Sequence, residues 1–204
     1  MNLHKIIDYL YNLSPFIYDW QLNFFNGNHF VILKNKLRKI PSDTIFEIGC
    51  GTAPILKVFN PSLYMGVDIE SKFIKLARNI YRKRSNYHFS VGDGREVILN
   101  KTFDIVLFSH TTHHLTDQDI KNLLLKIKDY KFKHVVIYDG RPVGFFAPIL
   151  KRMDYKAAKF RKTADFIPLI GNDYKIDHLE TFVANRPFYE YQLLILSKNN
   201  QTAL

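Results

Sequence analysis

The stretch TIFEIGCGTA, residues 44–53, joins a run of β-branched and aromatic residues to a turn that contains two glycines. Such a run is typical of a buried strand. Glycines directly after a strand allow left-handed backbone conformations and let the main chain approach a ligand closely. We therefore predict a strand that ends in a ligand-binding turn, at the point where the chain enters a helix.

The sequence around this stretch alternates between β-rich runs and helical patterns. Apolar residues at helical spacing follow Ser71, and a second helical pattern follows Thr116 and Asp119, which resemble a capping box. This alternation indicates stacked βαβ units and a mainly parallel sheet. The predicted strands cover residues 44–48, 63–68, 87–91, 103–108 and 134–139.

The two ends of the chain show different patterns. Residues 1–40 are predicted to form one or two helices with a break near Pro15. Residues 144–170 are predicted to be helical with an interruption, and residues 179–183 and 188–196 to form an antiparallel hairpin beside the parallel sheet. Because no internal repeat or long linker divides the chain, we expect residues 41–204 to form one compact unit.

Composition limits the class of protein. The 29 Lys and Arg residues exceed the 19 acidic residues by ten, and 47% of residues are hydrophobic, as in a soluble globular domain. The single cysteine, Cys50, excludes a disulfide framework, a zinc site of the usual cysteine spacing and a cysteine-held iron–sulfur cluster. Without a secretory signal pattern or an apolar run of about 18 residues, we expect a cytoplasmic protein.

Acidic residues end the next two predicted strands. Asp68 lies 19 residues beyond Gly49, a distance that places it to accept hydrogen bonds from ribose hydroxyls, and Asp93 lies between two glycines. A nucleoside cofactor would therefore lie across the carboxyl ends of the first three strands. A dinucleotide site would need a third glycine where Pro54 stands, and Glu47 would repel a pyrophosphate but suits a positive amino or sulfonium group.

The segment Glu47-Ile48-Gly49-Cys50-Gly51-Thr52-Ala53 resembles the first motif of the class I S-adenosylmethionine (SAM)-dependent methyltransferases, acid-x-Gly-x-Gly-x-Gly, with Ala53 at the third glycine. Gly66-Val67-Asp68-Ile69 is similar to the second motif and Gly92-Asp93 to the third. Residues 103–108 with Thr112-His113-His114-Leu115 resemble the fourth-strand motif of small-molecule methyltransferases. Loosely, the resemblance extends over residues 15–196.

This resemblance implies a Rossmann-like α/β three-layer sandwich that binds SAM and releases S-adenosylhomocysteine (SAH). It implies that Asp68 binds the ribose, that Asp93 holds the adenine amino group, and that residues 1–40 form a lid to which Tyr18 and Trp20 could contribute, unless they pack in the core. The cofactor-binding residues expected are Glu47, Gly49, Cys50, Gly51, Asp68, Ile69, Gly92, Asp93, Gly94 and Ser109.

Methyl transfer from a sulfonium requires mainly orientation and desolvation of the acceptor. A hydroxyl acceptor also benefits from a base, and His110, His113 and His114 follow the fourth predicted strand as candidate catalytic residues, unless they cap or pack against the next helix. We predict no metal site, because no acidic residue lies immediately beside these histidines. The fifth strand ends with Tyr138, Asp139 and Arg141, which are further candidates to line the acceptor pocket. As with the histidines, the alternative is a purely structural role.

Two absences narrow the reaction. Residues 109–112 read SHTT and lack the Asn/Asp-Pro-Pro-aromatic motif used to methylate exocyclic or amide nitrogens, so base or glutamine N-methylation is disfavoured. Cys50 lies in the cofactor turn, where it is badly placed as the nucleophile that cytosine C5 methylation needs.

Residues 151–162 contain six cations with interleaved aromatics, which suits RNA or an acidic membrane surface but equally a solvated helix face. The favoured hypothesis is a SAM-dependent methyltransferase that acts on a small-molecule acceptor at oxygen. Its rivals are an RNA methyltransferase and a non-catalytic SAM-binding protein. Acids at three strand ends weigh against the latter, since a decayed site need not keep carboxylates unpaired at a buried edge.

Overall fold

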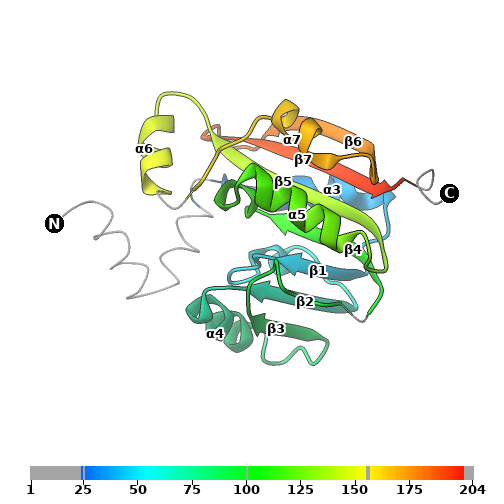
Figure 1. Cartoon of the computed structure of the whole chain (residues 1–204). Helices are drawn as coiled ribbons and strands as arrows, with labels where there is room; N and C mark the ends of the chain where they lie inside the picture. Colours follow the sequence, from blue (N-terminus) through cyan, green and yellow to red (C-terminus); the bar gives the residue numbers. More distant parts are fainter. Residues whose placement is uncertain (1–23, 25, 100, 155–156, 200–204) are drawn as a thin grey trace.

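The computed structural model describes residues 24, 26–99, 101–154 and 157–199. They contain a seven-stranded sheet of order β3-β2-β1-β4-β5-β7-β6 (Figure 1). The first five strands pair in parallel, and β7 pairs antiparallel with both β5 and β6. The strands are β1 (Thr44–Ile48), β2 (Leu63–Asp68), β3 (Tyr87–Val91), β4 (Phe103–Ser109), β5 (Phe132–Pro142), β6 (Tyr174–Val183) and β7 (Tyr189–Lys198).

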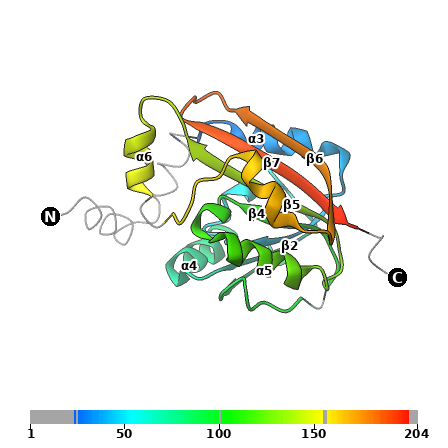
Figure 2. The same cartoon turned by 45° about the horizontal axis from the view of Figure 1, so that its top comes forward.

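Helices cover both faces of this sheet. The α-helices are α3 (His29–Lys36), α4 (Ser71–Ile80), α5 (Asp117–Ile127), α6 (Ala147–Met153) and α7 (Thr163–Ile170). Three 3-10 helices accompany them, namely η1 (Leu37–Lys39), η2 (Pro54–Lys57) and η3 (Thr112–His114). Figures 1 and 2 show α5 and α7 on one face of the sheet, α3 on the other, and α6 beyond the carboxyl end of β5. No helix among the described residues has the length and apolarity to cross a membrane.

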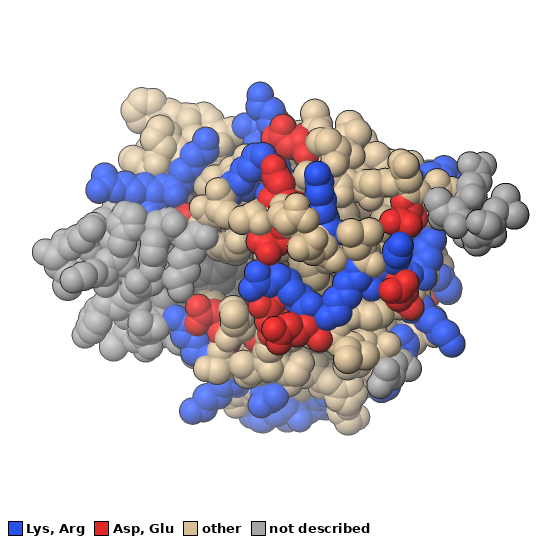
Figure 3. Space-filling model, viewed as in Figure 1, with Lys and Arg blue, Asp and Glu red and all other residues tan. Residues whose placement is uncertain are grey.

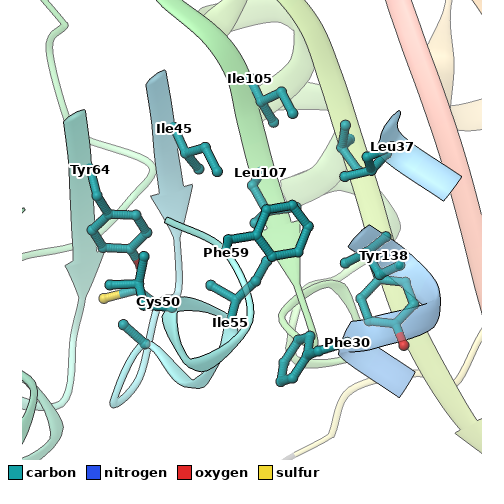
Figure 4. Close-up of a cluster of buried hydrophobic side chains, with 14 of the residues drawn as sticks. Phe30, Leu37, Ile45, Cys50, Ile55, Phe59, Tyr64, Ile105, Leu107 and Tyr138 are labelled. Atoms are coloured by element: carbon teal, nitrogen blue, oxygen red, sulfur yellow. The ribbon is translucent and has the colours of Figure 1, made fainter. Parts of the chain in front are cut away.

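Two clusters of buried side chains, one on each side of the sheet, hold these layers together. In the first, Phe30 and Leu37 from the N-terminal segment meet Ile55 of η2 and Leu107 of β4 (Figure 4). In the second, leucines of α5 and Phe166 of α7 pack against β4 and β5. Each fully buried aliphatic side chain contributes about 1.5–3 kcal/mol. The architecture is the predicted α/β three-layer sandwich.

The predicted strands at residues 44–48, 63–68 and 87–91 coincide with β1, β2 and β3. The capping box of Thr116 and Asp119 is also confirmed, with the Thr116 hydroxyl accepting from the Asp119 N–H. Both β5 and β6 are longer than predicted. They continue because β7 pairs with β5 as far as Pro142 and with β6 from Tyr174 onward.

The prediction that β1 leads into an α-helix is wrong. Only the four-residue η2 follows, and Ala53 precedes it at a φ of 55°, in the left-handed region. Asn60 and Pro61 follow soon after η2 and limit the length of any helix that could form there, since proline cannot continue a helix. The position at which Ala53 departs from the family motif therefore keeps a backbone conformation that favours glycine.

The predicted break near Pro15 and the candidate lid residues Tyr18 and Trp20 lie outside the described residues. The described part of the predicted lid consists of α3, η1 and a few flanking residues. Helix α3 buries Phe30 and Leu33 against the sheet, so this part of residues 1–40 is integrated into the main core.

We expect Gly66→Ala to destabilise the protein by about 1–3 kcal/mol, the usual cost of overpacking. A Cβ at this position of β2 would lie 2.7 Å from Cys50 Sγ and 3.0 Å from Tyr64 Cε1, and both neighbours are buried. The matched control is Gly92→Ala, whose Cβ would make an ordinary contact at 3.5 Å with Val67. Thermal unfolding of both variants checks this, and equal midpoints would contradict it.

Candidate functional site

A cavity of about 470 Å³ lies where the turns after β1, β2, β3 and β4 come together. All thirteen predicted site residues line it: Glu47, Gly49, Cys50, Gly51, Asp68, Ile69, Gly92, Asp93, Gly94, Ser109, His110, His113 and His114. They come from segments separated by up to 67 residues in sequence, from Glu47 to His114. The parallel sheet brings them together because the carboxyl ends of its strands share one edge.

Hydrogen bonds to β2 fix the glycine turn at residues 49–51. The N–H groups of Gly49 and Cys50 both donate to the Val67 carbonyl, at 2.8 and 3.1 Å. Gly49 has a φ of 73°, and a Cβ there would lie 2.4 Å from Thr111 Oγ1. Gly51 has a φ of 52°, but a Cβ there would meet nothing within 4 Å. Gly49 is therefore required by packing, whereas Gly51 faces open space of the kind that a ligand needs.

Glu47 lies at the base of the cavity and is only 2% exposed. Tyr64, on the neighbouring strand β2, donates its hydroxyl to the Glu47 carboxylate. Burial raises the pKa of Glu47 to about 8, against the opposing effect of the Tyr64 hydrogen bond and with a further increase from the charge of Asp68. At neutral pH this side chain is therefore largely protonated.

Asp68 ends β2 and accepts two backbone hydrogen bonds, from the Gly51 N–H at 2.7 Å and the Glu70 N–H at 2.8 Å. It thereby fixes the glycine turn to the next strand. Its pKa is raised, with burial as the largest cause and these hydrogen bonds acting in the opposite direction. Ile69 follows with 68% of its surface exposed at the cavity, an apolar surface suited to a flat ligand.

Asp93 is engaged by Arg95, whose Nε and Nη2 both donate to its carboxylate. This bond and the positive charge of Arg95 lower the pKa of Asp93 despite partial burial. Arg95 also bonds Asp119 at 3.0 Å, which links the turn after β3 to α5. The interpretation that the strand-end carboxylates are unpaired is therefore wrong, since Glu47, Asp68 and Asp93 all have partners within the chain.

Cys50 and Ser109 line the cavity from positions that are almost fully buried, at 2% and 6% exposure. Burial, with the nearby charges of Glu47 and Asp68, raises the pKa of the Cys50 thiol well above its ordinary value. The thiol therefore stays protonated at neutral pH. This agrees with its expected unsuitability as a nucleophile.

His110 has a φ of 53°, an uncommon conformation for a residue with a side chain. Its Nε2 lies 3.3 Å from Nδ1 of His29, which in turn lies 2.9 Å from the Tyr138 hydroxyl. Burial lowers the pKa of His110 to about 4, against the attraction of Asp139, and that of His29 to about 2, with the charge of His110 acting in the same direction. Both imidazoles are therefore neutral at pH 7.

His113 is in the opposite electrostatic state. Its Nδ1 lies 2.7 Å from Asp139 Oδ1 and its Nε2 lies 3.1 Å from Asp154 Oδ2. Burial opposes protonation, but the charges and hydrogen bonds of these two carboxylates outweigh it and raise the pKa of His113 to about 10. With both ring nitrogens engaged and a proton held at neutral pH, His113 does not suit the role of base.

The reason given against a metal site holds for the sequence but not for the folded chain. No acidic residue adjoins the histidines in sequence, yet the fold places Asp139 and Asp154 against His113. His114, the third candidate, is exposed at the cavity, and one ligand atom from each of His113, His114 and Asp154 lies within 4.8 Å of the other two.

The described part of the basic stretch at residues 151–162 is not a uniformly solvated face. Arg161 is 3% exposed, and its guanidinium donates to the carbonyls of Thr112 and Leu115 and to Asp117. Lys159 also pairs with Asp117, at 2.8 Å. On the face drawn in Figure 3, basic and acidic side chains are interspersed.

Residues that the sequence analysis did not single out complete the site. His29 and Phe30 of α3 line the cavity, as do Arg95 and Asp154. For His29 and Phe30 the only signal was that residues 1–40 were expected to form a lid. Contacts such as that of Asp154 with His113 join residues far apart in sequence, so no spacing rule identifies them.

A family model described as a methyltransferase domain matches residues 45–130. No curated protein sequence matches the chain. Many solved structures are similar to it. Magnesium protoporphyrin IX methyltransferase from Synechocystis PCC 6803, with bound SAH, has a TM-score of 0.63 at 16% identity, over 96% of this chain and 100% of that one.

The same Synechocystis enzyme with bound SAM has a TM-score of 0.63 at 15% identity, over 98% of each chain. The N-methyltransferase NodS from Bradyrhizobium japonicum WM9 has a TM-score of 0.65 at 12% identity, over 87% of this chain and 98% of that one. Both the family model and the fold agree with the motifs quoted above. Residues 45–130 thus match the model of a methyltransferase domain, and the chain that carries them has the fold of the class I S-adenosylmethionine-dependent methyltransferases.

Proposed function

We propose that this protein transfers the methyl group of SAM to a hydroxyl oxygen of a small molecule. The observation that carries the proposal is the single cavity that joins the residues of the methyltransferase motifs to the neutral imidazole of His110. Neighbours in fold include a magnesium protoporphyrin IX methyltransferase and an N-methyltransferase, and the first of these supports a small-molecule acceptor.

The cavity fits SAM in three respects. The open space at Gly51 admits a ligand close to the backbone, and the two oxygens of Asp68 keep lone pairs for ribose hydroxyls beside their backbone bonds. Ile69 offers an apolar surface to an adenine ring, and Asp93, beside Arg95, is the candidate partner of its amino group. When bound, SAM supplies a methyl group on a positively charged sulfur, which is an excellent leaving group.

The remaining task of the chain is to orient the acceptor and take its proton. A neutral His110 can accept the hydroxyl proton while the oxygen electron pair forms the bond to the methyl carbon and the carbon–sulfur pair leaves with SAH. His29 and Tyr138 hold the His110 ring in place. We assign the base to His110 because both ring nitrogens of His113 are engaged by carboxylates.

The alternatives have weaker support. For RNA methylation the sequence offered the basic stretch at residues 151–162, but Arg161 and Lys159 are occupied by internal bonds. Loss of binding to RNA with rising salt would revive that function. A non-catalytic SAM-binding protein would bind the cofactor without turnover of any acceptor. We also propose that residues 1–40 complete the acceptor side of the cavity, since His29 and Phe30 already line it.

We expect calorimetric titration to give micromolar binding of both SAM and SAH, and Asp68→Ala to weaken it about 100-fold. The estimate follows from roughly 1.5–3 kcal/mol for a hydrogen bond to a charged group. Asp43→Ala is the matched control, because Asp43 also accepts a backbone bond, from Ser62, but lies outside the cavity. No heat with either ligand, or heat only with a nicotinamide dinucleotide, would overturn the proposed cofactor.

We expect SAM binding at pH 7 to release protons from Glu47. Its pKa of about 8 keeps the carboxyl protonated in the free protein, and a cationic ligand in the same cavity lowers that pKa. Binding heats measured in phosphate and in Tris should therefore differ, by the number of protons released multiplied by the difference between the ionisation heats of the two buffers. Glu47→Gln should abolish this difference. Identical heats for the wild-type protein in both buffers would contradict this coupling.

We expect His110→Ala to lower kcat about 100-fold or more for a hydroxylated acceptor found by mass-spectrometric screening, with unchanged SAM affinity. Because the pKa of His110 is about 4, the wild-type rate should show no inflection near pH 6.5 and should fall only as the pH approaches 4. His88→Ala, an exposed histidine on β3, is the control. An inflection near pH 6.5, or an unaffected His110→Ala, would assign the base elsewhere.

A further inference from the structure

We infer that His113, His114 and Asp154 form a binding site for a divalent transition metal ion of the zinc class, with Asp139 as the residue that orients His113. One ligand atom from each of the three lies within 4.8 Å of the other two. The binding of the ion does not depend on the proposed function, although its catalytic role does.

Main-chain contacts bring the three side chains together. His113 and His114 belong to η3, directly after β4, whereas Asp154 follows the end of α6. The N–H groups of Ala158 and Lys159 both donate to the His113 carbonyl, at 2.7 and 3.0 Å. The segment after α6 is therefore fastened onto η3 by its backbone, and the arrangement does not rest on exposed side chains alone.

Asp139 gives His113 the orientation that metal-binding histidines have. Its Oδ1 accepts from His113 Nδ1 at 2.7 Å, which leaves Nε2 as the nitrogen that faces Asp154. The same carboxylate accepts hydrogen bonds from the Thr112 hydroxyl and from the N–H groups of His113 and Gly140. These bonds fix its position. A carboxylate behind a histidine fixes the tautomer and increases the basicity of the coordinating nitrogen.

The donor set and its spacing suit zinc. Two imidazoles and one carboxylate, with a fourth position open to water or substrate, are a typical catalytic zinc set. Bonds of about 2.0–2.2 Å place the ligand atoms of a tetrahedral site roughly 3.3–3.5 Å apart. His113 Nε2 and Asp154 Oδ2 are 3.1 Å apart, and His114 offers a third ligand atom within 4.8 Å of the other two. Magnesium prefers oxygen ligands and should not bind.

The position of this site next to the SAM motifs gives a bound ion a role in the reaction. All three residues line the same cavity as the SAM motifs. An ion at this place could bind the acceptor oxygen at its open position and lower the pKa of that hydroxyl, which would assist transfer of the proton to His110. Without an ion, a proton shared between His113 and Asp154 supplies the positive charge, and the cluster is an ion pair only.

The test is titration of the chelator-treated, full-length protein with Zn²⁺ by calorimetry and with Co²⁺ by visible absorption, in the absence of SAM and acceptor. We expect one ion per chain, a Co²⁺ d–d band typical of four-coordination, and no heat with Mg²⁺. His114→Ala and Asp154→Asn should each weaken Zn²⁺ binding at least tenfold and remove the Co²⁺ band. Asp139→Asn should weaken it about 10- to 100-fold, as substitutions of orienting residues do.

His178→Ala is the matched control, because His178 also pairs with a carboxylate, Glu180 at 3.2 Å, but lies outside the cavity. It should leave the affinity unchanged. Circular dichroism establishes that each variant is folded, which matters most for Asp139→Asn because Asp139 is buried. Absence of stoichiometric Zn²⁺ and Co²⁺ binding by the folded wild-type protein, or affinities that His114→Ala and Asp154→Asn leave unchanged, would overturn the site. Loss of SAM binding in the separate titration would overturn only the proposed function.

Discussion

The carboxylate of Asp139 is the contact on which the rest of the site depends. It lies at 3% exposure near the end of β5 and receives four hydrogen bonds, three of them from Thr112 and His113 on η3. Burial of a carboxylate is costly unless it is fully bonded. Here the positive charge of His113 outweighs burial and holds the pKa of Asp139 below its ordinary range. The turn after β4 therefore has one favourable position, and the histidines are placed by it.

The charge of the cavity lining differs in sign from the net charge of the chain. The chain carries a formal charge of +10, yet the carboxylates of Asp68, Asp93 and Asp154 line the cavity, beside the carboxyl group of Glu47, which is protonated until a cation binds. Local carboxylates act over a few ångströms, whereas the charge of distant lysines is screened by salt. A cationic ligand is therefore attracted into a protein that is itself positive. The overall charge in this case gave little information about the ligand.

Much of the fold could be predicted from the sequence, because the first strands are continuous apolar runs that end in glycines and acids. The registers follow from the same runs, and Ile45 pairs with Tyr64 and Ile105. The cofactor side of the cavity could be predicted because its residues lie within turns directly after strands. The acceptor side could not, since the contacts of His29, Asp154 and Arg161 span tens of residues and carry no periodic pattern.

The shortness of η2 and the length of β6 were missed for local reasons. Helix η2 ends at Lys57, and Pro61 follows too soon for a long helix to form there, whereas β6 is an edge strand whose exposed residues interrupt the apolar pattern. Edge strands contribute only one buried face, so their sequences resemble loops. For β6 the pairing with β7 determined the boundary, which propensity alone does not encode.

The position of β7 has a consequence for the synthesis of the chain. Among the described strands it comes last in sequence, yet it lies inside the sheet between β5 and β6. While a ribosome is still producing residues 189–198, the backbone groups along one edge of β5 have no partner strand, and β6 has none at all. Unpaired edges of this kind are sites of aggregation. The residues of the glycine turn are therefore synthesised before β7 can pair with β5 and β6. Pairing of β7 then removes the unpaired edge of β5.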